Sequence, residues 1–170
     1  NRRRFLGRLG LIGAAVGGGW WLKDNVLWRR PDIEFPATAS WIGFDEPRAI
    51  LPTVRVEIAG QSVRALIDSG AQYSVIDRGL LETLGLKSGF DVPMVAYGVG
   101  GNPQVGRGIT LDISVAGLAI RNLRTAILAL GPLAMRDGLS APLILGQDIL
   151  SRAQLIVEAP LRRLRLVPTQ

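Results

Sequence analysis

The most informative stretch of this sequence is Leu66-Ile67-Asp68-Ser69-Gly70-Ala71. An apolar strand that ends in an aspartate among small residues leaves the carboxylate partly desolvated, which is costly unless the group is neutral or paired. Asp68 is therefore the candidate catalytic residue, with Ser69 and Gly70 beside it in the site. Gly70 lets the backbone turn tightly, so that its N–H can approach the carboxylate. The competing interpretation is an Asx-turn between two strands.

The composition excludes most other hydrolytic sites. The chain of 170 residues contains no His and no Cys, so Ser-His-Asp triads, Cys-His pairs and zinc sites built on His or Cys are excluded. Only Lys23 and Lys87 could serve a Ser-Lys dyad. Acid–base catalysis would then fall mainly on carboxylates, and we expect no metal or cofactor. The net charge of +6 comes mostly from arginines near the two ends, so we expect no nucleic-acid partner.

The N-terminal region has the pattern of an export signal. Arg2-Arg3-Arg4-Phe5-Leu6 resembles the twin-arginine signal, and a Gly-rich apolar run follows from residue 9 to residue 22. This run is shorter than the roughly 20 residues that span a bilayer, but an N-terminal membrane anchor remains the alternative. In both cases the arginines stay cytoplasmic. We therefore expect an exported protein, periplasmic or anchored in the inner membrane facing the periplasm. Residues 1–39 would be signal or anchor and leader, and residues 40–170 the folded domain.

The rest of the chain reads as short strands. Apolar and polar residues alternate from 53 to 58, the period of a half-buried strand, and residues 63–67 return as the second strand of a hairpin after a turn at 59–62. Asp77 is placed to cap a short helix that ends at Gly85. Further strands are expected at 73–76, 92–99, 105–115, 118–130, 142–146, 155–158 and 161–167, with a second short helix at 148–152. The fold class predicted is mostly β with one or two short helices.

Three sequence elements follow one another along the chain. They are the Asp-Ser-Gly-Ala loop, a glycine-rich hairpin tip at residues 98–101, and Leu143-Ile144-Leu145-Gly146 before a helix. Together they resemble the retropepsin-like aspartic peptidases, which include bacterial members, over about residues 53–167. The resemblance implies a closed β-barrel of the acid-protease type that forms half of a two-fold dimeric enzyme, with Asp68 as the catalytic residue. It also implies that the hairpin is a flap whose residues contact the substrate: Tyr97, Gly98, Val99, Gly100 and Gly101. Tyr97 is equally compatible with a surface aromatic. A nucleotide-binding loop is disfavoured because a strand, and not a helix, follows the tip.

A single carboxylate is insufficient for this chemistry. One acid must take a proton from water while a second, protonated acid donates to the scissile carbonyl, and two carboxylates about 3 Å apart share one proton. A faint internal repeat aligns Gly146 with Gly70, but residues 143–145 carry no carboxylate. We interpret Asp148 as a helix N-cap or a member of an ion pair. The prediction is therefore a homodimeric endopeptidase with two copies of Asp68 on its axis, acting on extended peptide or protein substrates.

Two other hypotheses remain open at this point. The first is a catalytically silent peptide-binding or assembly module on the same fold. The second is a membrane-tethered structural β-barrel without a ligand. Binding of a pepstatin-type inhibitor and cleavage of a peptide library distinguish the peptidase from both.

Overall fold

The computed structural model describes residues 29–46, 51–87, 89–97, 103–130 and 141–169. Apart from Arg29 and Arg30, these residues belong to one compact unit, Pro31–Gln170. The unit starts upstream of the boundary expected at residue 40, because a strand at Asp32–Glu34 already pairs with the rest of the sheet. The export signal predicted at the N-terminus lies outside the described residues. No helix within the described ranges is long and apolar enough to cross a membrane.

Short strands dominate the described part of the chain, as the alternation pattern predicted. The helices are α2 (Arg78–Thr83) and α4 (Gln147–Leu150), with a 3-10 turn at Ala159–Leu161. The strands are β1 (Asp32–Glu34), β2 (Ile42–Gly43), β3 (Thr53–Ile58), β4 (Gln61–Ile67), β5 (Val75–Asp77), β6 (Phe90–Tyr97), β7 (Pro103–Val115), β8 (Leu118–Leu128), β9 (Leu143–Leu145), β10 (Ala153–Glu158) and β11 (Arg163–Pro168).

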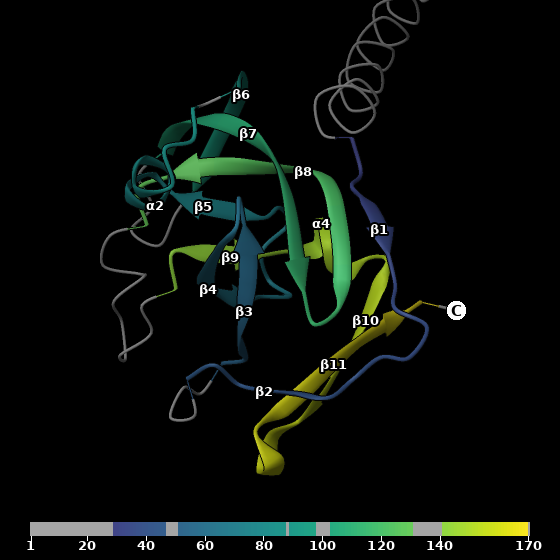
Figure 1. Cartoon of the computed structure of the whole chain (residues 1–170). Coiled ribbons are helices and arrows are strands. Elements are labelled where there is room, and N and C mark those ends of the chain that lie inside the picture. The colour runs from purple at the N-terminus through teal and green to yellow at the C-terminus, as the bar shows by residue number, and fades with distance from the viewer. Residues whose placement is uncertain (1–28, 47–50, 88, 98–102, 131–140, 170) are drawn as a thin grey trace, which may run out of the picture. The chain divides into compact units, whose positions relative to one another are not determined.

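The larger sheet closes on itself. Its order is β1-β8-β5-β9-β4-β3-β7-β6, and β7 also pairs with β8, so the strands from β8 to β7 form a closed barrel (Figure 1). Closure removes the free edges that an open sheet of these strands would expose. The barrel, the mostly β content and the two short helices confirm the predicted fold class.

Two hairpins of the barrel use the same two-residue turn. Ala59 and Gly60 have φ values of 50° and 77°, and Ala116 and Gly117 have 54° and 82°. Positive φ at both central residues gives the turn whose twist matches that of the flanking strands. The β3–β4 turn is therefore shorter than the predicted turn at 59–62, because β4 already begins at Gln61.

The interior of the barrel follows the period-2 pattern. In β3 the side chains of Val54, Val56 and Ile58 are buried, while Arg55 and Glu57 are exposed. The same inward set continues on the neighbouring strands. It includes Ala65, Ile67, Ile113, Val115, Leu118, Ile120, Leu123, Leu143 and Leu145.

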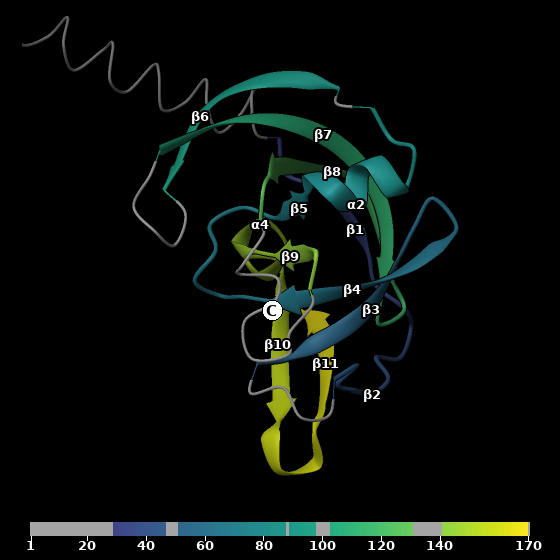
Figure 2. The same ribbon diagram turned by 90° about the vertical axis from the view of Figure 1, so that its left-hand side faces the viewer.

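The order of the central strands brings distant parts of the chain together. β9 lies between β4 and β5, parallel to β4 and antiparallel to β5 (Figure 2). Ile67 at the end of β4 is in register with Leu145 at the end of β9. Because the two strands run in the same direction, the loop after β4 and the turn before α4 emerge at the same end of the barrel.

The segment before β3 is built onto the domain at two places. β1 pairs with β8, and β2 pairs with β11 to complete a three-stranded sheet, β10-β11-β2. Trp41, next to β2, stacks against the guanidinium groups of Arg163 and Arg165, which lie 4.6 and 4.7 Å from its ring centroid. The described part of the predicted leader therefore packs on the domain through the pairing of β1. Residues 41–43, just after it, add the pairing of β2 and the cation–π contacts.

Candidate active site

Asp68 lies directly after β4, and its backbone is held on both sides. Its N–H donates to the carbonyl of Leu145 at 3.0 Å, and its carbonyl accepts the N–H of Ala71 at 3.2 Å. The Asp68 carboxylate accepts the N–H of Gly70 through Oδ1 at 2.8 Å. The side chain is half-buried. The loop thus presents one oriented carboxylate at the end of a rigid strand, with room for further partners.

Gly70 suits this geometry. A Cβ atom at position 70 would lie 3.1 Å from Oδ1 of Asp68, tighter than an ordinary contact. The expected approach of the Gly70 N–H to the carboxylate is therefore present. Ser69 is exposed and uses its carbonyl to accept a bond from Gln147.

The turn between β9 and α4 packs directly on the Asp68 loop. The backbone N–H of Gln147 donates to the carbonyl of Ala71, and its side-chain Nε2 donates to the carbonyl of Ser69, both at 2.8 Å. A Cβ atom at Gly146 would lie 2.7 Å from the carbonyl oxygen of Ala71 and 2.8 Å from carbonyl atoms of Tyr73. Only glycine permits this approach. The internal repeat identified Gly146, but the two bonds from Gln147 leave no local signal in the sequence.

Asp148 is not the helix cap that the sequence predicted. The N-cap of α4 is Gly146, because β9 ends at Leu145 and the helix begins at Gln147, which places Asp148 in the first turn. Its two oxygens accept the N–H and the hydroxyl of Ser74, each at 2.8 Å. Among the ion pairs of the described residues none involves Asp148. Both oxygens of the carboxylate are therefore engaged with Ser74.

Burial raises the pKa of Asp148 above its ordinary value of 3.8, although the bonds from Ser74 and the N–H of Ile149 act in the opposite direction. Ser74 itself is fully buried, and its Oγ also accepts the N–H of Gly146 at 3.1 Å. From the sequence, Ser74 was predicted only as one residue of a strand at 73–76. A serine between apolar residues was the one available hint that a buried polar partner was needed.

The predicted flap is present as a hairpin. β6 and β7 are antiparallel, with Tyr97 opposite Pro103. The register shifts between Asp91 and Met94, which marks an irregularity in the middle of the hairpin. The tip residues Gly98, Val99, Gly100 and Gly101 lie outside the described residues, and Tyr97 is described only through its place in β6. Contact of these residues with a substrate therefore stays a prediction.

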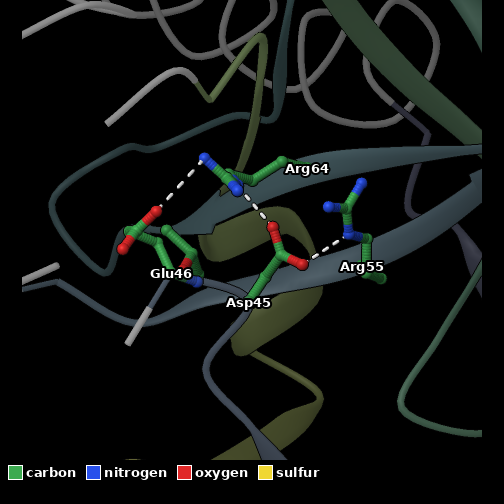
Figure 3. Close-up of polar contacts among 5 residues, drawn as sticks. Asp45, Glu46, Arg55 and Arg64 are labelled. Atoms are coloured by element: carbon green, nitrogen blue, oxygen red, sulfur yellow. Dashed lines mark hydrogen bonds and ion pairs between the residues drawn. The ribbon is translucent and has the colours of Figure 1, made fainter. Parts of the chain in front are cut away.

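A second charged cluster lies on the hairpin that carries Asp68. Asp45 accepts bonds from the Nε atoms of Arg55 and Arg64, which face each other on β3 and β4 (Figure 3). Oε2 of Glu46 lies 3.8 Å from a terminal guanidinium nitrogen of Arg64. Burial raises the pKa of Asp45, but the bonds from Arg64 and Arg55 outweigh it and leave the pKa lowered. Because both oxygens of Asp45 are taken by arginines, the cluster ties the segment before β3 to the hairpin.

The described ranges contain no group of three or more His, Cys, Asp or Glu side chains that could hold a metal ion. What the site offers chemically is a single oriented carboxylate on an ordered loop. Such a carboxylate can accept a proton from water, but a second acid is needed to donate one to a carbonyl oxygen.

Comparison with known proteins points the same way. A family described as "Aspartyl protease" matches residues 54–149. A retropepsin-like aspartic protease from Rickettsia conorii has a similar structure, with a TM-score of 0.51 and 16% identity, covering 81% of this chain and 95% of that one. The likeness at this identity concerns the fold.

Two further solved structures are similar at lower TM-scores. The retroviral protease-like domain of Ddi1 from Leishmania major gives 0.49 with 22% identity, covering 72% of this chain and 100% of that one. The EIAV protease, in complex with an inhibitor, gives 0.48 with 24% identity, covering 59% and 86%. No match was found among curated proteins.

Proposed function

Because the chain belongs to the aspartyl protease family, we propose that it is an endopeptidase that works as a homodimer, with Asp68 of each protomer in one shared site. The observation that carries this proposal is the Asp68 carboxylate itself. It stands at the end of β4, half-buried, oriented by the N–H of Gly70, with no other described hydrogen bond. A carboxylate that is oriented but otherwise unbonded can pair with a second acid.

The second acid has to come from another copy of the chain. Residues 143–145, which occupy the matching place at the end of β9, carry no carboxylate. Asp148, the nearest acid in that half, is engaged with Ser74. A two-fold axis passing beside the loop would bring two identical loops together, since an isologous contact pairs a surface with itself.

The reaction then follows from two carboxylates that share one proton, since both cannot ionise at about 3 Å. The ionised Asp68 takes a proton from a water molecule, whose oxygen attacks the carbonyl carbon of the peptide bond. The protonated Asp68 gives its proton to the carbonyl oxygen, which yields a neutral tetrahedral intermediate. Collapse of this intermediate breaks the C–N bond as the nitrogen receives a proton, and leaves a new carboxyl group and a new amino group. The mechanism uses no cofactor.

Two finer parts of the proposal rest on the sequence. The β6–β7 hairpin, with its glycine-rich tip, would close over an extended peptide that pairs with it as an added strand. The arginine-rich N-terminus supports export, with the protein either periplasmic or anchored in the inner membrane and facing the periplasm.

The test compares Asp68→Asn with a matched control, Asp112→Asn, in the full chain. Asp112 is an exposed carboxylate that also accepts one backbone N–H, from Asn122 at 2.9 Å. Cleavage of a diverse peptide library should fall by at least about 10³-fold in Asp68→Asn, as is typical when a reacting group is removed, and stay unchanged in Asp112→Asn. Undiminished cleavage by purified Asp68→Asn rejects Asp68 as the catalyst.

The shared site has its own test. When wild type and Asp68→Asn are refolded together in equal amounts, random pairing leaves about one quarter of the dimers with two intact copies of Asp68, whereas a monomeric enzyme would retain about one half of the activity. Retention of half the activity excludes a site shared between two chains. If wild type neither cleaves peptides nor binds a pepstatin-type inhibitor at acidic and neutral pH, the result favours a catalytically silent module on the same fold.

A further inference from the structure

The far end of the Asp68 loop is anchored by a buried polar pair. The loop runs from Asp68 to Ser74, where the chain enters β5. At this point Asp148 receives both hydrogen-bond donors of Ser74, the N–H on Oδ2 and the hydroxyl on Oδ1, each at 2.8 Å. The two residues are 74 positions apart in the sequence, so the pair fastens the loop to the segment that follows β9.

Every polar atom of Ser74 has a hydrogen-bond partner. Besides its two bonds to Asp148, its Oγ accepts the N–H of Gly146 at 3.1 Å, and its carbonyl accepts the N–H of Ala126 at 3.0 Å. The residue is fully buried. If Asp148 could not accept, a buried N–H and a buried hydroxyl would lose their partner, which folded proteins rarely tolerate. The loop would have to move to restore these bonds.

The remaining bonds between the loop and the segment lie at less buried residues. They join Asp68 to Leu145, and they join Ser69 and Ala71 to Gln147. Asp68, Ser69 and Ala71 are exposed or half-buried, so water can replace a lost partner there, whereas Ser74 is fully buried. The two bonds from Ser74 to Asp148 are therefore the ones along this contact that cannot be given up without moving the loop.

We propose that Asp148 is a positioning residue for Asp68, which holds the loop through Ser74 in the geometry that catalysis requires. This inference rests on the proposed function, because it assigns a purpose to the placement of Asp68. Asp148 itself does not touch the substrate. A shift of the loop by a fraction of an ångström would displace the Gly70 N–H. Because this N–H donates to the Asp68 carboxylate, the shift would also change the orientation of the carboxylate. Displacements of about 1 Å can cost about 10²-fold in rate.

A matched control exists on the neighbouring strand. Asp77 also accepts two backbone N–H groups, one on each oxygen, from Leu130 and Gly79 at 2.8 Å. It is the last residue of β5 and caps α2, and its carboxylate bonds to no residue of the Asp68 loop. Asp77→Asn thus removes a carboxylate that accepts two donors, as Asp148 does, but without removing a bond to the loop.

The experiment measures kcat and KM for Asp148→Asn, Ser74→Ala, the double variant and Asp77→Asn, with kcat expressed per active site counted by a tight-binding inhibitor. The Gly70 amide resonance in ¹H–¹⁵N spectra reports the loop independently of activity. We expect Asp148→Asn and Ser74→Ala each to lower kcat about tenfold or more, with KM changed less than about threefold, and to shift the Gly70 resonance. The double variant should lose little beyond either single variant, since the two residues act as a unit. Asp77→Asn should keep kcat per active site within about twofold of wild type.

Two results overturn the inference: an unchanged kcat per active site in Ser74→Ala and Asp148→Asn, or an unmoved Gly70 resonance in both. Ser74→Ala removes only a hydroxyl, so it remains informative if Asp148→Asn does not fold. If wild type cleaves no peptide, the proposed function fails by itself. The Gly70 resonance still decides whether Asp148 sets the loop.

Discussion

Gly146→Ala tests how tightly the Asp68 loop is packed on the turn before α4. The added Cβ would meet the Ala71 oxygen at 2.7 Å and two carbonyl atoms of Tyr73 at 2.8 Å, where ordinary contact begins at 3.4 Å. The overlap is therefore about 0.6–0.7 Å with three backbone atoms, and none of them belongs to a side chain that could rotate away. Overpacking of this kind costs about 1–3 kcal/mol. Displacing the loop also weakens the bond from the Gln147 N–H to Ala71, worth about 1 kcal/mol.

The sum predicts a loss of about 2–4 kcal/mol in the free energy of unfolding. At about 2–4 °C per kcal/mol for a domain of this size, Tm should fall by about 4–16 °C. The assay is thermal unfolding followed by circular dichroism, with all variants at one protomer concentration because the proposed dimerisation would make Tm depend on concentration. Gly89→Ala is the control, since a Cβ there meets nothing within 4 Å and its φ is not positive. A Gly146→Ala protein that melts within about 2 °C of wild type would refute the packing argument.

Two further predictions concern the dependence of stability on pH. At Asp45 burial raises the pKa, but the bonds from Arg64 and Arg55 outweigh it and lower the pKa, so the stabilisation is present above about pH 4 and is lost as the pH falls through the folded-state value. Asp45→Asn should cost about 1 kcal/mol in urea unfolding at pH 7, since Arg55 is exposed, and less as the pH falls through the folded-state value; a cost that does not change with pH contradicts this. At Asp148 burial raises the pKa, so its contribution is full below about pH 4 and is lost as the pH rises through the folded-state value. Asp148→Asn should therefore flatten the decline of stability over that range, and an unaltered slope in a pH series of urea titrations would count against it.

Local patterns were enough to predict most of the barrel. Residues 53–58 alternate because one face of β3 meets the core, and the prediction held from Val54 to Ile58, whereas Thr53 is buried as well. Asp77 was recognised as a cap because the bond to Gly79 is local, and Gly85 follows with φ of 66°. Periodicity and capping depend on neighbours within a few positions, so a single sequence carries them.

The site was predictable only in part, because its supports come from distant residues. Asp68 and Gly70 lie in one short motif, and the sequence identified both. Asp148 was assigned to a cap by a local rule, whereas its place is set by where β9 ends and by Ser74, 74 positions away. The short strands β1 and β2 were likewise missed, since they have no alternation of their own and form by pairing with β8 and β11.

The position of β9 has a consequence for the order in which the protein is made. The strand lies between β4 and β5 in the sheet, yet it is translated only after β8. Until then the Asp68 N–H lacks its acceptor, the carbonyl of Leu145. With synthesis at roughly 5–20 residues per second, the β3–β4 and β7–β8 hairpins can pair on the ribosome while the loop still lacks its support. A prematurely terminated chain therefore carries the aspartate but not the framework that aims it. Any hydrolytic capacity of this protein should arise only when β9 and the turn before α4 have left the ribosome.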